Sequence, residues 1–140
     1  MESVGLIIIA RDTNRIFLLH RSKPPITWSS LSGKMEKGEN PLQSIKREIK
    51  EEIGITPSMI DNIEELGKSN TNHHVMVGYV DNEFKVPNLK LDENDSYGWF
   101  SKNNLPSPIH PKWSSTYEFI KPLLDLREAI KKNFNKLINE

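Results

Sequence analysis

The sequence predicts one α+β domain over residues 1–140, in which strands lie before and after a central helix and a longer helix closes the chain. Three observations support this prediction. Short apolar runs rich in β-branched residues flank the central helix, and such runs favour strands. Two other segments carry apolar residues at helical spacing. The length is that of one domain, large enough to bury about two-thirds of the surface that the unfolded chain exposes.

The first quarter of the chain is predicted to hold strands. Residues 4–10 form a continuous β-branched run that is too short for a helix, so we interpret it as a buried strand. Residues 12–15 have turn chemistry, and the apolar run 16–19 completes a predicted hairpin. A loop stiffened by prolines over 22–28 then leads into a short strand at 29–32, which enters a glycine loop.

The central helix is marked clearly at both of its ends. Asn40 is a good N-cap, Pro41 suits the first helical position, and Gln43 completes a capping box. Gly54 is a natural C-cap. Between these ends the apolar side chains are spaced by three and four and form one stripe, which consists of Leu42, Ile45, Ile49 and Ile53.

Further strands are predicted after the central helix. The clearest is the run His74–Val80, because of its branched and aromatic content. Asp81 and Asn82 suit a hairpin turn into the next strand, and an acidic loop precedes the last one. The predicted strands are 63–69, 74–80, 84–86 and 97–100.

The segment from Ser115 to about Ile138 is predicted to form the C-terminal helix, after a proline-rich loop. Pro122 lies inside it and should kink the helix or mark a break. Apolar residues carry helical spacing along its whole length, at positions 119, 120, 123, 124, 126, 130, 134, 137 and 138.

The face of the central helix opposite the apolar stripe is acidic. Glu48, Glu51 and Glu52 stand at i, i+3 and i+4, so their carboxylates project from one side. Such a face is usually only solvated surface. Like charges so placed repel by about 0.2–0.5 kcal/mol per pair in solvent, and in a cleft they would need a counter-charge. Arg47 can pair with Glu51 but does not neutralise three carboxylates. A hard divalent cation would do so, and oxygen-only ligands favour magnesium or manganese over zinc.

The complete pattern over residues 33–55 resembles the signature of the Nudix hydrolases. The spacing is G-x5-E-x7-R-E-U-x-E-E-x-G-U, where U is aliphatic. Many members carry two glycines where this chain has Ser32 and Gly33, and the fixed motif position is Gly33. Every fixed position is met, by Gly33, Glu39, Arg47, Glu48, Ile49, Glu51, Glu52, Gly54 and Ile55.

Several properties follow as implications of this resemblance. It implies an α/β/α sandwich with a mixed central sheet, and the activity of a pyrophosphohydrolase that acts on acid anhydrides. Magnesium or manganese is the implied cofactor. The implied metal ligands are Glu48, Glu51, Glu52 and the backbone carbonyl of Gly33.

Other motif positions have implied roles beside the metal. Arg47 and Glu39 are expected to hold the loop and the helix together, and a metal-ligand role for Glu39 is an equal alternative. The general base is expected among the motif glutamates Glu51 and Glu52, or in the later acidic loop, from Glu93 or Asp95. A water activated by metal alone is the remaining alternative. Gly54 is expected to be structural.

The resemblance implies a small-molecule nucleotide substrate, commonly a nucleoside diphosphate linked to another moiety, such as ADP-ribose or a dinucleoside polyphosphate. A base is usually held by stacking on an aromatic ring. Nucleoside triphosphate sanitation and RNA cap removal are alternatives, and a non-catalytic nucleotide-sensing module is an alternative of another class. Candidate rings are Trp28, Phe84, Tyr97 and Trp113, and candidate phosphate contacts are Arg21, Lys23 and Lys34, although packing or solvation is the commoner role of each.

The composition limits the partners. The formal net charge is zero and the sequence pI is about 6.9, so neither duplex nucleic acid nor an anionic membrane is expected as a partner. The longest apolar run, Leu6–Ala10, is too short to span a bilayer, and the start lacks a basic leader, so a cytoplasmic location is expected. No cysteine is present to form a disulfide or bind zinc. A monomer and a homodimer are both compatible with the sequence. The neighbours His73 and His74 should face opposite ways on a strand, so paired metal ligation is not expected.

Overall fold

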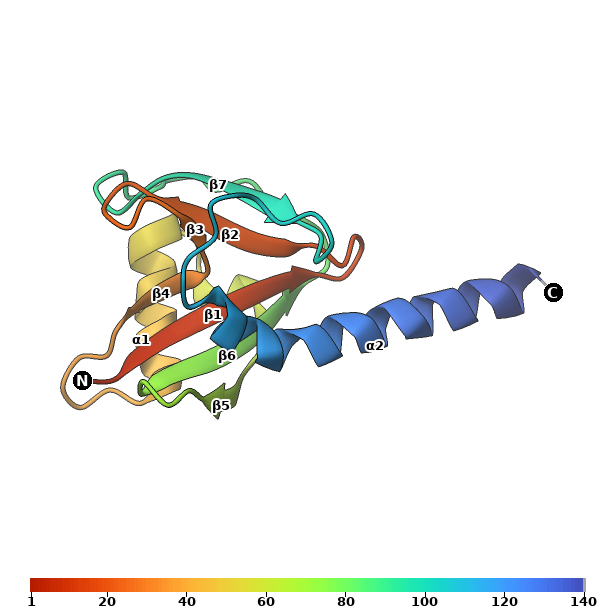
Figure 1. Ribbon diagram of the computed structural model, residues 1–140, viewed down its shortest axis with the longest axis horizontal. Helices are drawn as coiled ribbons and strands as arrows, with labels where there is room; N and C mark the ends of the chain where they lie inside the picture. Colours follow the sequence, from red (N-terminus) through yellow and green to blue (C-terminus); the bar gives the residue numbers. More distant parts are fainter. Residues whose placement is uncertain (140) are drawn as a thin grey trace.

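A mixed sheet lies between two helices in the computed structural model, which describes residues 1–139 (Figure 1). The order of the central strands is β3-β2-β1-β6-β5, with β4 paired to β1 and β7 paired to β2. This arrangement confirms the predicted α+β class and the α/β/α sandwich. The elements are β1 (Ser3–Ala10), β2 (Ile16–Arg21), β3 (Trp28–Ser29), β4 (Leu31–Lys34), α1 (Pro41–Glu48), the π-helix η1 (Ile49–Ile53), the 3₁₀-helix η2 (Pro57–Met59), β5 (Asp61–Lys68), β6 (His73–Val80), β7 (Asn94–Phe100) and α2 (Trp113–Asn139).

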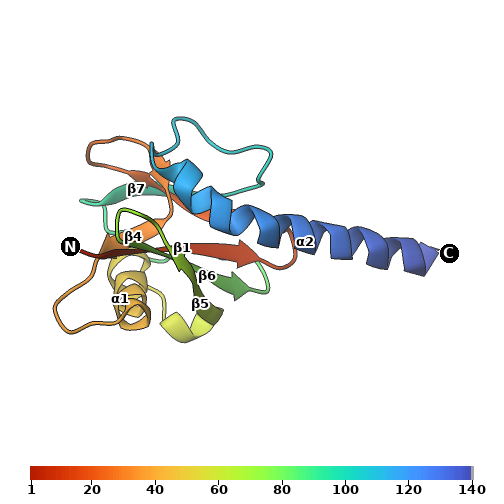
Figure 2. The ribbon, with the colours of Figure 1, turned by 60° about the horizontal axis from the view of Figure 1, so that its bottom comes forward.

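The strand β1 is the centre of the sheet and divides the core in two. Its neighbour on one side is β6, which runs parallel to it over its full length. On the other side, β4 pairs with the first half of β1 and β2 pairs only at Ile9. Successive side chains of β1 face opposite ways. Those of Leu6 and Ile8 pack under α1 and η1, whereas those of Ile7 and Ile9 pack under α2. Figure 2 shows the two helices on opposite faces of the sheet.

The predicted strand over residues 84–86 is wrong, because this segment is a loop. Its backbone polar groups bind side chains instead of a neighbouring strand. Tyr97 accepts a hydrogen bond from the backbone N–H of Val86 at 3.1 Å, and the indole of Trp99 donates to the carbonyl of Phe84 at 3.1 Å. The Phe84 ring packs 5.4 Å from the buried ring of Phe17. Aromatic packing therefore holds this segment against the core without a ladder.

The C-terminal helix is longer than predicted and continues through Pro122 without a break. Only its first half packs on the sheet, through Trp113, Ile120 and Leu124. The second half projects away from the body of the molecule (Figures 1 and 2). Its apolar side chains are exposed, although they share the helical spacing of the buried ones: Leu126, Ile130, Phe134, Leu137 and Ile138. Within residues 1–139, neither helix is long and apolar enough to cross a membrane.

Candidate active site

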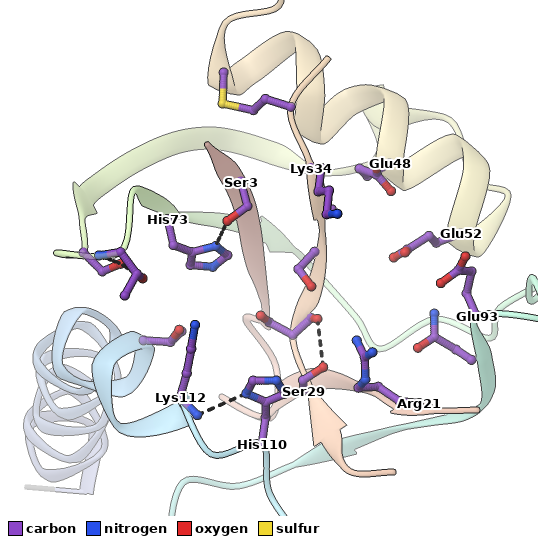
Figure 3. A pocket seen from close by; sticks show the side chains of 18 of the residues that line it. Ser3, Arg21, Ser29, Lys34, Glu48, Glu52, His73, Glu93, His110 and Lys112 are labelled. Carbon is purple, nitrogen blue, oxygen red and sulfur yellow. Dashed lines mark hydrogen bonds between the residues drawn. The ribbon is translucent and has the colours of Figure 1, made fainter. Parts of the chain in front are cut away.

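A cavity of about 800 Å³ opens at the beginning of β1, between the acidic helix on one side and the start of α2 on the other (Figure 3). Residues from distant parts of the chain line it, because β1 pairs with β4 and β6 at this end. Pairing places Ser3 opposite Lys34 on β4 and opposite His73 on β6. The sheet thus forms the floor of the cavity, and the two helices form its sides.

The acidic side of the cavity is built by α1 and η1. Asn40 and Gln43 form the predicted capping box, with reciprocal hydrogen bonds of 2.8 and 2.9 Å. After Glu48 the helix widens into the π-helix, which was not predicted, and it ends at Gly54 in the left-handed region with φ of 66°. Of the predicted apolar stripe, Ile45, Ile49 and Ile53 are fully buried, whereas Leu42 in the first turn is 38% exposed.

The three glutamates of the acidic face differ in burial. Glu48 and Glu52 are 7% and 8% exposed, whereas Glu51 is exposed to solvent. The neighbouring strand approaches this face closely at Gly33. A side-chain carbon added at Gly33 would lie 2.3 Å from the carboxyl carbon of Glu48. Glycine at this position therefore allows the backbone of β4 to approach the carboxylate of Glu48 closely.

Arg47 joins the loop to the helix through hydrogen bonds to four residues. It binds both carboxylate oxygens of Glu39, at 2.8 and 2.9 Å, and donates to the carbonyl of Lys34 at 3.1 Å. It also donates to Glu48 at 2.8 Å and to Glu51 at 3.2 Å. The guanidinium holds the pKa of Glu39 at about 2, well below its usual value. Both carboxylate oxygens of Glu39 thus contact Arg47, and one of them also accepts from the backbone N–H of Glu36 at 2.8 Å.

Glu52 is a buried carboxyl group that forms no ion pair within residues 1–139, although the charge of Lys90 acts on it from a distance. Its Oε2 atom is buried and has no hydrogen-bond partner within residues 1–139. Burial, together with the nearby carboxylates of Glu48 and Glu93, raises the pKa of Glu52 to about 8, against the opposing effect of Lys90. Burial also raises the pKa of Glu48, against the opposing effect of Arg47. Positive charge at this point would remove the penalty of ionising both groups.

The ligand atoms on the acidic side of the cavity are of the type that a divalent cation prefers. They are carboxylate oxygens with one orphaned buried atom, next to a strand whose backbone approaches closely at Gly33. In the described part of the chain, no three His, Asp or Glu side chains already converge as a ready-made metal cluster. Arg47 explains this arrangement, because it draws Glu48 and Glu51 toward itself. A cation would have to compete with the guanidinium for these oxygens.

The two candidate bases in the later acidic loop are placed differently. Glu93 lines the cavity, and its charge acts on Glu52. Asp95 does not line the cavity and instead binds the imidazole of His20 at 2.6 Å. Figure 3 shows Glu48, Glu52 and Glu93 along one side of the cavity. Among residues of this loop, Glu93 is therefore the one that the fold brings to the motif glutamates.

The structure brings only part of the predicted substrate contacts to the cavity. Arg21 and Lys34 line it. The predicted rings of Trp28, Phe84 and Tyr97 do not: Trp28 packs against His20 and Phe100, and the other two pack on Phe17. Their burial in aromatic clusters follows from long-range strand pairing. Trp113, the fourth candidate ring, lines the cavity but is 7% exposed. Lys23 is 3.5 Å from Glu93 and does not line the cavity.

Several cavity residues were not identified from the sequence. His73 enters from β6, and His110 and Lys112 enter from the loop before α2. Lys90 also lines the cavity and lies close enough to act on the pKa of Glu48 and Glu52. No local spacing relates these positions to the motif, because only the pairing of β1 with β6 and the packing of α2 bring them together.

Comparison with protein families gives a match over most of the chain. Residues 1–123 match the model described as the NUDIX domain. Dihydroneopterin triphosphate diphosphatase of Escherichia coli (strain K12) is 42% identical over 53 residues, which are 38% of this chain and 35% of that protein. The NAD-capped RNA hydrolase NudC of Pseudomonas aeruginosa (strain LESB58) is 32% identical over 111 residues, which are 74% of this chain and 38% of that protein. The matches thus span about a third of these relatives.

Solved structures include chains of the same fold. A binary complex of the C. elegans Ap4A hydrolase superposes with a TM-score of 0.65 and 22% sequence identity, over 94% of this chain and 99% of that one. Identity this low shows the shared fold alone. The three relatives are named for different substrates, so their names do not converge on one compound.

Proposed function

The chain belongs to the NUDIX domain family, and we propose that it hydrolyses a phosphoanhydride bond with the help of a divalent cation. The proposed substrate is a small nucleotide in which a nucleoside diphosphate is linked to another moiety, such as ADP-ribose or a dinucleoside polyphosphate. The observation that supports this best is the carboxyl group of Glu52, which is buried near Glu48 and Glu93 at the side of a large cavity and has an oxygen without a hydrogen-bond partner within residues 1–139.

We assign the metal ligands of the proposed site to Glu48, Glu51 and Glu52, with the backbone carbonyl of Gly33. When bound, magnesium or manganese supplies positive charge that neutralises the phosphate oxygens of the substrate. Arg47 sets the position of Glu48 from the other side, through its paired contact with Glu39.

Proton transfer in the proposed reaction falls to a carboxylate that faces the cavity. Glu51, Glu52 and Glu93 are the candidates, because each lines the cavity and the charges of Glu51 and Glu93 act on Glu52. Any one of them would take a proton from the attacking water, in the role of a general base. Lys34 and Arg21, which line the same cavity, would bind the phosphate oxygens of the substrate.

A nucleoside triphosphate is the second candidate substrate. It is favoured by the segment of highest identity among the relatives above, which belongs to a protein named as a triphosphate diphosphatase. The two candidates differ in their products. A triphosphate would release pyrophosphate, whereas a dinucleotide would give two phosphorylated products and no free pyrophosphate.

A product assay tests the proposal directly. The purified protein is incubated with ADP-ribose, dinucleoside polyphosphates and nucleoside triphosphates, with magnesium and with excess chelator. We expect magnesium-dependent cleavage of at least one compound and none in chelator. Tight binding of a nucleotide that stays intact after long incubation would instead identify a nucleotide-sensing module and contradict the proposal.

A further inference from the structure

The side of the cavity opposite the glutamates carries basic side chains. His73 from β6 and His110 and Lys112 from the loop before α2 stand there, whereas Arg21, at the end of β2, pairs with Asn94 and lies between them and Glu93 (Figure 3). Among the cavity-lining residues of segments 69–73 and 110–116, none is acidic. The cavity therefore has one side where the glutamates lie together with Lys34 and Lys90, and an opposite side with basic groups alone, which we call the cationic side.

The four basic side chains lack the carboxylate partners that cations on a protein surface usually have. None of them forms an ion pair with a carboxylate within residues 1–139. Arg21 donates only to the backbone carbonyls of Pro24 and Pro25. Arg47, on the other side of the same cavity, contacts four glutamates by contrast.

The two histidines present free ring nitrogens in this region. The Nδ1 atom of His73 pairs with the hydroxyl of Ser3 at 2.7 Å, and its Nε2 has no hydrogen-bond partner in the described part of the chain. This Nε2 lies over Gly5: a side-chain carbon added there would be 2.6 Å from Nε2 and 3.3 Å from the hydroxyl oxygen of Ser30. In His110, Nδ1 accepts a hydrogen bond from the backbone N–H of Lys112 at 3.1 Å, so Nε2 carries the proton of the neutral ring and is a donor.

The charges of Arg21 and Lys112 affect the pKa values of the two histidines. Burial lowers the pKa of His73, and the charge of Lys112 lowers it further. Burial also lowers the pKa of His110, and the charges of Arg21 and Lys112 add to this effect. An anion bound between these groups would favour the protonated form of both rings, since none of the four side chains forms an ion pair with a carboxylate within residues 1–139. The helix α2 begins at Trp113 beside these groups, and the partial positive charge of its N-terminus has the same sign.

We propose that Arg21, His73, His110 and Lys112 form a second anion subsite, which binds a phosphate of the substrate other than the two joined by the scissile bond. This inference rests on the proposed function, because it assigns the two sides of one cavity to two parts of one substrate. The cavity volume of about 800 Å³ lies within the usual range for ligand sites and exceeds what a pyrophosphate group alone requires.

The subsite defines a class of substrates by their charge. The additional phosphate is carried either on a sugar of the nucleotide or within a longer polyphosphate chain. Both forms present anionic, non-bridging phosphate oxygens to histidine, lysine and arginine donors. A nucleotide that has only the two phosphates joined by the scissile bond places no anion among these four basic side chains. It is therefore the poorer substrate.

Binding of inorganic phosphate tests the subsite without any turnover. The ring signals of the histidines are followed by NMR at fixed pH in chelator, and His20 is the internal control because it binds Asp95 and does not line the cavity. We expect the ring signals of His73 and His110 to shift saturably with phosphate. Lys112→Glu should weaken the affinity for phosphate about tenfold or more. The matched control Lys85→Glu makes the same charge change at an exposed lysine outside the cavity and should leave the affinity unchanged. Equal shifts of His20, or an unchanged affinity in Lys112→Glu, would overturn the proposal.

Two substrate pairs then identify the source of the phosphate. ADP-ribose is compared with its 2′-phosphorylated form, and diadenosine diphosphate with diadenosine tetraphosphate. We expect Lys112→Glu to lower the preference for the more phosphorylated member, measured as a ratio of kcat/KM, about tenfold in one pair. A ratio unchanged in both pairs contradicts the subsite while leaving the proposed hydrolysis intact. If no compound is cleaved at all, the proposed function fails, and the phosphate titration alone decides whether the subsite exists.

Discussion

At the scale of single residues, the acidic side of the cavity combines two opposing requirements. Arg47 neutralises part of the negative charge and fixes the loop through Glu39, whereas Glu52 is buried without an ion-pair partner within residues 1–139, and its Oε2 has no hydrogen-bond partner there. A structural ion-pair network would have no reason to leave this carboxylate unpaired, because burying an unpaired charge is costly. The arrangement is therefore typical of a binding site.

Glu52 predicts how stability depends on pH when metal is removed. Its pKa is about 8 in the folded protein and about 4.5 when unfolded, so between these values the folded state binds more protons. The contribution of Glu52 to the free energy of unfolding is therefore largest below pH 4.5 and is lost as the pH rises from 4.5 toward 8. Urea unfolding in chelator at several pH values measures this slope. The Glu52→Gln variant cannot titrate at this position and should have a flatter profile. Identical slopes in the two proteins would show that Glu52 ionises normally.

Arg47→Lys tests whether the geometry of the guanidinium matters as well as its charge. Lysine keeps the charge but loses the paired contact with Glu39, so Glu48 loses its support. We expect turnover to fall about 10–100-fold, the usual effect of losing a group that orients a ligand. Arg15→Lys is the matched control, because Arg15 makes a similar paired contact with Glu83 away from the cavity. Equal losses of turnover in both variants would attribute the effect to general destabilisation.

At the scale of elements, the helix α1 with its extension η1 carries out two separate tasks. Its buried isoleucines fix it to the sheet, and its glutamates face the cavity. The π-helix comes between the positions of Glu48 and Gly54, so the last two motif glutamates stand on a wider turn than the first. Extra backbone turns of this kind are frequent at functional sites.

Two residues of the predicted apolar stripe, Ile49 and Leu42, share the helical spacing but differ in burial, so substituting each one tests which of them anchors the helix. Ile49 is fully buried, and Ile49→Asp should unfold the protein, while Ile49→Ala should cost about 2–5 kcal/mol. Leu42 shares the same spacing but is 38% exposed, so Leu42→Ala should cost much less, on the order of 0.5 kcal/mol. Thermal and urea unfolding measure both. A loss at Leu42 as large as that at Ile49 would contradict the observed placement of the helix.

At the scale of the whole molecule, the second half of α2 contributes little to the packed body. The buried side chains of this helix end at Leu124, and the last polar contact with the body is made by Lys131. Removing residues 133–140 should therefore leave the melting temperature and the turnover nearly unchanged. Calorimetry and the product assay measure the outcome. A large drop in melting temperature would show that the exposed apolar residues are covered in solution.

The sequence predicted most of the fold because local patterns determine most of its elements. The capping box at Asn40 and the β-branched run of β1 are local signals, and both were confirmed. The segment 84–86 could not be predicted, because its backbone binds side chains of Tyr97 and Trp99 that belong to a later strand. The exposure of the second half of α2 was also hidden, because helical spacing does not reveal whether a partner surface exists.

The same distinction applies to the candidate site. The motif placed the glutamates and Arg47 by sequence spacing alone. The cationic side is different, because His73 and His110 come from segments that only the sheet pairing and α2 bring together. Phe84 and Tyr97 are sequence candidates for stacking on a base, but their rings pack against Phe17 of β2 instead.

The most direct test of the central claim is the turnover and thermal unfolding of Glu52→Gln beside those of the intact protein. Glutamine keeps the size of the side chain and removes the buried charge. We expect magnesium-dependent hydrolysis to fall by more than about 100-fold, since a direct ligand should matter more than the groups that orient it. The melting temperature in chelator should stay the same or rise. A variant that unfolds, or one that keeps its turnover, would contradict the assignment of this carboxylate to the metal site.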